Sequence, residues 1–274
     1  MTFLQAIILG VVQGATEFLP ISSSGHIVLV PWWFGWDFPV DLTFIVAMHI
    51  GTLLAVLVYF WQDWLLISKG AFKILQTRSF DDSASRLFGW LVIGTIPVAF
   101  FGFLLADVLN RIFYTPILAA FFLLVTAGLL LLSEYLSTRI TATHTLDTMK
   151  TIDVLVVGIA QLLALLPGVS RSGSTIAAGL SRGLSRPDAA RFSFLLGTPT
   201  ILGAGILTLN KLLETGEVSN QPTIILAGTI SAAIVGYFSI AVLLNYLRRH
   251  RLHIFATYCA VFGLISLLAI LLDT

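Results

Sequence analysis

The chain has 274 residues, of which 57% are hydrophobic and only 11% are charged, and its formal net charge is +1. Soluble domains carry roughly 25% charged residues, and a soluble globule of this length could not hide so much apolar surface in one core. The mean hydropathy of +0.97 points the same way. A single cysteine, Cys259, excludes an intrachain disulfide framework, and the balanced charge indicates no nucleic-acid partner. The composition predicts an all-α polytopic membrane protein.

In chain order, six segments are long and apolar enough to cross a bilayer core of ~30 Å as helices. We predict these transmembrane helices at about 43–60, 88–106, 116–135, 191–209, 223–243 and 253–272. Two further apolar stretches, 3–34 and 152–184, are each interrupted near the middle by a proline and a Ser/Gly cluster. Broken backbone at membrane depth is tolerated only where it is buried in protein or lines a wet cavity. We therefore predict two re-entrant helix–loop–helix hairpins, with a kinked full span as the alternative for each.

An internal repeat supports this prediction. Five residues of the first interrupted stretch recur 148 residues later: Gly10, Gln13, Ser22, Ser24 and Gly25 return as Gly158, Gln161, Ser170, Ser172 and Gly173. A second block, Gly94-Thr95-Ile96, recurs 134 residues later as Gly228-Thr229-Ile230. Two blocks in the same order indicate a duplicated unit. We predict a single membrane domain, 1–274, with repeat 1 at about 1–136 and repeat 2 at about 151–274.

The predicted repeats have opposite orientations in the membrane. A hairpin returns the chain to its starting side and three spans carry it across, so the second repeat begins on the other face. Such an inverted-topology repeat is typical of transporters and places the functional site between the repeats. Of the fifteen Lys and Arg residues, twelve fall on one predicted face and two on the other. The positive-inside rule makes the rich face cytoplasmic and places both termini outside.

Two ionisable side chains remain deep in the apolar stretches, Glu17 and Arg171. A charge at the bilayer centre costs about 2.5–3.5 kcal/mol on insertion scales, so both should face a cavity or each other. A structural Glu–Arg pair that locks the repeats together is the alternative to a functional site. His49, inside a span, is interpreted as a packed or pore-lining histidine rather than a ligand.

Each hairpin carries its own chemistry. In the first, Gln13 and Glu17 share one helix face, and Ser22, Ser23 and His26 follow the break. A carboxylate, hydroxyls and an imidazole can form a nucleophile with an acid–base group, or hold a metal. The second supplies hydroxyls, a guanidinium and free N–H groups at a helix start, which suit an oxyanion or phosphate. These residues are Ser170, Arg171, Ser172, Gly173, Ser174 and Thr175. The residues alone indicate chemistry or transport of a phosphorylated, lipid-like molecule.

Residues 13–26 (QGATEFLPISSSGH) and 167–175 (PGVSRSGST) resemble the two signature motifs of the undecaprenyl-diphosphate phosphatase family of the bacitracin-resistance type. The length, the two hairpins and the six spans are also similar, so the resemblance covers essentially the whole chain. Members remove the terminal phosphate of undecaprenyl diphosphate and regenerate the monophosphate carrier lipid for cell-wall synthesis. The resemblance implies a multi-pass phosphatase of the bacterial plasma membrane whose partners are the bilayer and a polyprenyl diphosphate lipid.

The resemblance also implies roles for the matching residues. Glu17 takes the essential acidic position, which binds a divalent cation or acts as base. Ser23 and His26 take the positions for attack on phosphorus and for proton transfer. Arg171 matches the group that grips the diphosphate. The expected substrate-binding residues are Ser22, Ser170, Ser172, Gly173 and Thr175.

The expected cofactor is Mg²⁺ or Ca²⁺, with Glu17 and Gln13 as the metal-binding residues. Gln13 stands where some members carry a second glutamate, and this weakens the case for two carboxylate ligands. We expect the diphosphate to enter from the outer face and Ser23 to attack with help from Glu17 and His26. Attack by water or by His26 stays open. The alternative function is a transporter or flippase of a polyprenyl-phosphate-type lipid, and a channel or scaffold is a third. A homodimer is a further expectation.

Overall fold

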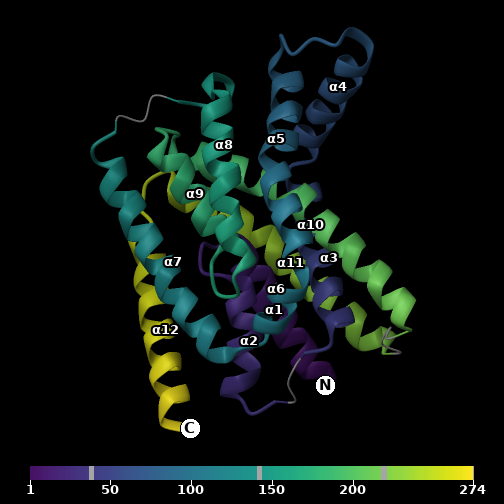
Figure 1. Cartoon of the computed structure of the whole chain (residues 1–274), viewed down its shortest axis with the longest axis vertical. Helices are drawn as coiled ribbons and strands as arrows, with labels where there is room; N and C mark the ends of the chain where they lie inside the picture. Colours follow the sequence, from purple (N-terminus) through teal and green to yellow (C-terminus); the bar gives the residue numbers. More distant parts are fainter. Residues whose placement is uncertain (37–39, 141–143, 217–220, 274) are drawn as a thin grey trace.

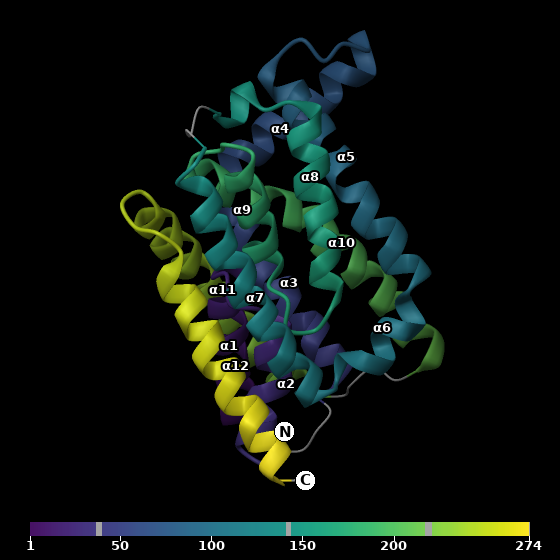
Figure 2. The same cartoon turned by 60° about the vertical axis from the view of Figure 1, so that its left-hand side comes forward.

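The computed structural model describes residues 1–36, 40–140, 144–216 and 221–273, and the described chain is almost entirely helical. Six helices are long and apolar enough to cross a membrane, which confirms the six predicted spans. They form one bundle (Figures 1 and 2). The six are α3 (Leu42–Tyr59), α5 (Ser83–Leu104), α7 (Pro116–Ser137), α10 (Arg186–Thr215), α11 (Pro222–Leu247) and α12 (His253–Asp273).

Each interrupted apolar stretch forms a pair of short helices joined by a turn. The first pair is α1 (Phe3–Phe18) with α2 (Ser23–Trp33), and the second is α8 (Thr151–Ala160) with α9 (Arg171–Ser181). A short 3-10 segment, η2 (Gln161–Leu165), extends α8 toward its turn. The chain reverses direction in both pairs (Figure 1), and the two helices of each pair pack against each other. The 16 residues of α1 rise about 24 Å, less than the ~30 Å of a hydrocarbon core.

The two turns are closed by the same local contacts. Ser22 Oγ accepts a hydrogen bond from the backbone N–H of Gly25 at 3.3 Å, and Ser170 Oγ accepts one from Gly173 at 3.0 Å. Each serine therefore caps the helix that follows it. Each also lies 3.2 Å, Oγ to Oγ, from the serine two residues later. Residues matched in the sequence repeat thus make matching contacts.

Glycines allow the helices of each pair to pack closely on a span from the other half of the chain. α1 lies along α11, where a Cβ at Gly10 would stand 2.4 Å from the Gly228 carbonyl oxygen. α8 lies on α5, where a Cβ at Gly158 would stand 2.7 Å from the Gly94 carbonyl oxygen. Because backbone blocks both positions, a side chain at either glycine would push the helices apart. These contacts hold the two turns inside the bundle.

Two helices lie outside the six predicted spans and the two pairs. α4 (Trp61–Thr77) packs against α5 at one end of the molecule, and α6 (Ala106–Phe113) leads into α7. A shorter 3-10 turn, η1 (Leu146–Thr148), precedes α8. The charged segment from Lys69 to Arg86 contains the end of α4, a short turn and the start of α5. Lys73 Nζ lies 2.6 Å from Asp82 Oδ2 across the α4–α5 turn, and this hydrogen bond holds the pKa of the Asp82 carboxyl below its usual range.

Buried carboxylates join the loops at the end of the molecule that carries α4. Glu134 in α7 is 1% exposed and accepts hydrogen bonds from Arg186 Nη2 at 2.6 Å and from the Leu252 backbone N–H at 2.8 Å. It thereby connects α7, the start of α10 and the α11–α12 loop. Two further carboxylate–arginine pairs are Asp63–Arg191 and Asp153–Arg182. The marked chain ends lie at the opposite end of the molecule (Figures 1 and 2).

Replacing Glu134 by glutamine should lower stability without moving the polar turns. Removing one partner of a buried ion pair leaves the other charge uncompensated, and this costs about 3–5 kcal/mol. Thermal unfolding in detergent measures the effect. Asp81→Asn, at an exposed position, is the control and should leave the melting temperature nearly unchanged. Equal melting temperatures for the two variants would contradict a structural role for Glu134.

Candidate active site

Glu17 and Arg171 meet where the two polar turns come together. Glu17 lies in the last turn of α1 and Arg171 is the first residue of α9. Arg171 Nη2 donates a hydrogen bond to Glu17 Oε1 at 2.9 Å, and the side chains are 12% and 6% exposed. The sequence predicts that these two deep charges face a cavity or each other, and in the structure they contact each other. Residues 154 positions apart in the sequence therefore form one buried ion pair.

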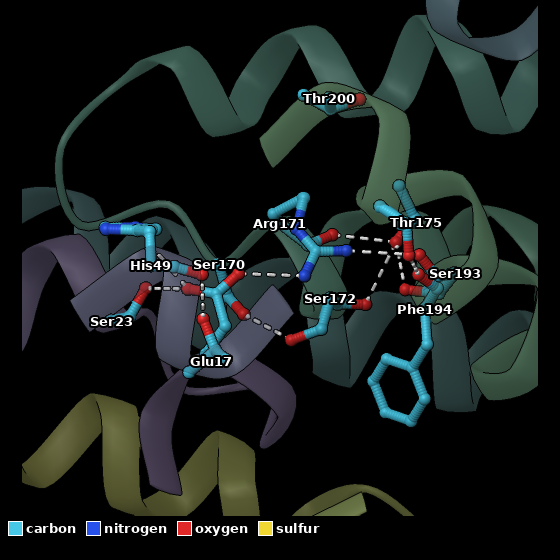
Figure 3. A network of polar contacts seen from close by, with 12 residues as sticks. Glu17, Ser23, His49, Ser170, Arg171, Ser172, Thr175, Ser193, Phe194 and Thr200 are labelled. Atoms are coloured by element: carbon cyan, nitrogen blue, oxygen red, sulfur yellow. Dashed lines mark hydrogen bonds and ion pairs between the residues drawn. The ribbon is translucent and has the colours of Figure 1, made fainter. Parts of the chain in front are cut away.

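The second oxygen of Glu17 carries a different set of contacts. Glu17 Oε2 accepts hydrogen bonds from Ser23 Oγ at 2.6 Å and from Gln13 Nε2 at 3.0 Å. Figure 3 shows Ser23 and Arg171 on opposite sides of Glu17. One carboxylate therefore contacts a hydroxyl through one oxygen and a guanidinium through the other. The predicted nucleophile Ser23, the predicted base Glu17 and the Arg171 guanidinium therefore lie within one cluster.

The guanidinium of Arg171 is also held from α10. Arg171 Nη1 donates to the Ser193 carbonyl oxygen at 3.1 Å, and Thr175 Oγ1 lies 2.6 Å from Ser193 Oγ (Figure 3). A Cβ built at Gly197 would lie 1.9 Å from Arg171 Nη1 and 2.3 Å from its Cζ. The guanidinium thus occupies space that exists only because residue 197 has no side chain.

The remaining residues of the predicted phosphate cradle build the two turns. Ser22, Ser170 and Gly173 make the capping contacts described above, and Ser172 Oγ donates to the Leu19 carbonyl oxygen at 3.1 Å. That last bond joins the α9 turn to the α1 turn. These residues form hydrogen bonds that shape the two turns. Their contact with substrate stays a prediction.

The two ring nitrogens of His26 contact partners other than Glu17. Its Nδ1 is 2.7 Å from the Ser22 carbonyl oxygen, and its Nε2 is 2.7 Å from Tyr258 Oη on α12. The ring is 3% exposed and stacks with Tyr258 and Phe262. Within the described chain, neither ring nitrogen hydrogen bonds to Ser23 or Glu17. The structure does not bring His26 to the carboxylate, and its role in proton transfer stays a prediction.

Residues 6–265 match the family described as Bacitracin resistance protein BacA. The chain belongs to the BacA family. Relatives named undecaprenyl-diphosphatase cover nearly its whole length. That of Thermomicrobium roseum is 48% identical over 98% of this chain and 99% of its own. Those of Pelotomaculum thermopropionicum and Methanosphaera stadtmanae are each 42% identical, over 96% and 98% of this chain and 95% and 98% of their own. The expected family is therefore confirmed.

Three residues of this BacA-family chain contact Glu17 or Arg171 although the sequence did not predict these contacts. His49 on α3, interpreted from the sequence as a packed or pore-lining histidine rather than a ligand, places Nε2 3.8 Å from Glu17 Oε2. Ser193 and Gly197 contact Arg171 from α10. None of the three lies in a polar motif, and each reaches the site through packing of α3 or α10. Of the three, only His49 could have been noticed in the sequence, because it is a polar residue within an apolar span. That position is equally consistent with a packed histidine.

Substituting Gly197 by leucine should displace the Arg171 guanidinium. A shift of about 1 Å in a reacting or binding group can lower rates about 100-fold, so we expect at least that loss of phosphate release. Gly203→Leu is the matched control, because a Cβ at Gly203 on the same helix meets no atom within 4 Å. Initial rates from monodisperse proteins measure the difference. Similar rates for the two variants would show that Arg171 does not depend on this space.

Proposed function

We infer that this chain hydrolyses undecaprenyl diphosphate to undecaprenyl phosphate and inorganic phosphate, and so recycles the carrier lipid of cell-wall synthesis. The observation that carries this function is the buried Glu17–Arg171 pair, with Ser23 2.6 Å from the carboxylate. A hydroxyl beside a base and a guanidinium is suited to phosphoryl transfer. Full-length relatives named undecaprenyl-diphosphatase support the substrate. The same activity accounts for the bacitracin resistance in the family description.

In the proposed mechanism Ser23 Oγ attacks the terminal phosphorus. The hydroxyl proton passes to Glu17 Oε2, an O–P bond forms, and the bond from phosphorus to the bridging oxygen breaks. Undecaprenyl phosphate leaves, and water then hydrolyses the phosphoserine to inorganic phosphate. Arg171 neutralises charge on the phosphoryl oxygens, for which preorganised donors in a water-poor site are most effective. Direct attack by water, which forms no covalent intermediate, and attack by His26, which forms a phosphohistidine that water then hydrolyses, are the alternative routes.

A divalent cation fits the residues beside Glu17. Gln13 Oε1 is buried without a hydrogen-bond partner, although the amide nitrogen of the same side chain bonds to Glu17. Carboxylate and carbonyl oxygens are the ligands that Mg²⁺ and Ca²⁺ prefer. Among described residues, no group of three or more His, Cys, Asp or Glu side chains forms a metal cluster. We propose that Glu17 and Gln13 hold the cation, which when bound withdraws charge from phosphate oxygens.

The proposed topology is an inverted repeat with two re-entrant hairpins. Its support is the matched serine caps and the matched glycine contacts, in which each hairpin packs on a span of the other repeat. The marked chain ends share one end of the molecule, opposite the end with the Arg-rich loops. By the positive-inside rule, we propose that both termini lie outside the plasma membrane and that the site opens to the outer face. Homodimer assembly stays a prediction.

Phosphate release from undecaprenyl diphosphate by detergent-purified protein tests the function. We expect release that EDTA abolishes and that added Mg²⁺ or Ca²⁺ restores. The competing flippase function predicts movement of lipid across a vesicle bilayer without loss of phosphate. No release from monodisperse protein with either cation would overturn the phosphatase. Release that is insensitive to EDTA would overturn the cation while leaving the reaction intact.

A further inference from the structure

His49 presents an unused ring nitrogen to the Glu17 carboxylate. Its Nδ1 lies 2.9 Å from the Ile45 carbonyl oxygen, so Nδ1 carries the proton. In the neutral ring the lone pair is then on Nε2, which lies 3.8 Å from Glu17 Oε2. This distance exceeds that of a hydrogen bond. A lone pair and a carboxylate oxygen repel each other unless a proton, a water molecule or a metal cation lies between them, and a metal cation would use both as ligands.

Gln13 approaches the same carboxylate oxygen as His49. Gln13 Nε2 is 3.0 Å from Glu17 Oε2, while Gln13 Oε1 is buried and unpartnered. The two ends of an amide have nearly the same shape, so turning the amide by half a turn places the oxygen beside Oε2. Two ligands of one ion can be at most about 4.2 Å apart when each bond is ~2.1 Å. Both distances, 3.8 Å and 3.0 Å, lie within this limit.

The surroundings of His49 also suit a ligand. Histidines that bind metals almost always donate their other ring N–H to a carbonyl or carboxylate, which fixes the ring, and Ile45 supplies that acceptor here. The His49 side chain is 28% exposed, whereas Glu17 is 6% exposed, so His49 is the more accessible of the two. Arg171 occupies the other carboxylate oxygen, Oε1, and Ser23 donates to one lone pair of Oε2, so an ion would take the position on Oε2 that the Gln13 N–H now holds.

We propose that His49 Nε2 is a ligand of the divalent cation, together with Glu17 and Gln13. This assignment rests on the cation of the proposed function and adds a nitrogen donor to its oxygen ligands. Imidazole shifts affinity toward first-row transition metals and away from Ca²⁺. The site should therefore bind Mn²⁺ more tightly than Ca²⁺, and Mn²⁺ should support phosphate release.

Electron paramagnetic resonance of Mn²⁺ tests the assignment without relying on activity. Wild-type protein should bind Mn²⁺ and show hyperfine coupling to one histidine nitrogen. His49→Ala should lose the coupling and bind Mn²⁺ at least about tenfold more weakly. His49→Gln keeps an oxygen donor, so it should lose the coupling with a smaller loss of affinity. His250→Ala, at an exposed histidine outside the site, should match wild type.

Three results would overturn the proposal: no Mn²⁺ binding by wild type, bound Mn²⁺ without nitrogen coupling, or coupling that persists in His49→Ala. If His49→Ala is not recovered as monodisperse protein, the coupling in His49→Gln decides the matter. Failure of the phosphatase would be distinct. It would appear as absent phosphate release from wild-type protein that nevertheless shows nitrogen-coupled Mn²⁺.

Discussion

Replacing Arg171 by methionine should lower the rate of phosphate release by about 10³-fold or more, the range measured for arginines that stabilise a transferring phosphoryl group. Its guanidinium is held at once by Glu17 Oε1 and by the Ser193 carbonyl oxygen, so its charge is fixed in position beside Glu17. Methionine keeps most of the side-chain length and removes the charge. Initial rates of phosphate release under saturating substrate measure the loss.

Arg182→Met is the matched control for this substitution. Arg182 follows the other end of α9 and donates to Asp153 Oδ1 at 2.8 Å, so its loss also breaks an ion pair with a buried carboxylate. We expect lower stability from Arg182→Met but a rate within a few-fold of wild type. If both variants lose activity to the same extent, Arg171 acts through stability and not through the substrate.

Replacing Glu17 by glutamine should lower activity by about 10²–10⁴-fold, the usual contribution of a general base. The amide keeps the shape of the side chain but cannot accept the Ser23 proton. It also leaves the Arg171 guanidinium buried without its counterion, which costs about 3–5 kcal/mol of stability. Phosphate release and thermal unfolding, measured on the same preparation, separate the two effects.

Two comparisons make the Glu17 prediction specific. Glu134→Gln removes another buried carboxylate that pairs with an arginine, and it should lose stability while retaining activity. The double variant Glu17→Gln with Arg171→Met should be more stable than either single variant, because no uncompensated charge remains, and it should still be inactive. Additive losses of stability in the double variant would argue against a direct coupling of the two residues.

The sequence was sufficient for features that depend on local pattern. The six spans follow from the length of apolar runs, and the two turns follow from Pro20 and Pro167 with their Ser/Gly clusters. Glu17 and Arg171 could be limited from the sequence to facing a cavity or each other, because each is too costly to leave alone in an apolar layer. The cost of burying a lone charge thus restricted where these two side chains could lie without any information on the distance between them.

Features that depend on packing between distant helices could not be predicted. His49 reaches Glu17 because α3 packs beside α1, and Gly197 makes room for a guanidinium from another helix. The family resemblance assigns His26 to proton transfer for attack by Ser23, yet its ring nitrogens contact the Ser22 carbonyl oxygen and Tyr258 of α12. α4 was not predicted because charged residues interrupt its apolar sequence, which therefore contains no apolar run long enough to indicate a span.

Hydrolysis of undecaprenyl diphosphate in water enriched in ¹⁸O tests the central claim most directly, since it reports which phosphorus atom is attacked. A site in which Arg171 and Ser23 act on the terminal phosphoryl group predicts one ¹⁸O atom in the released inorganic phosphate and none in undecaprenyl phosphate. Mass spectrometry of both products from one reaction gives the result. Label in the lipid product, or no released phosphate from folded protein, would contradict the account.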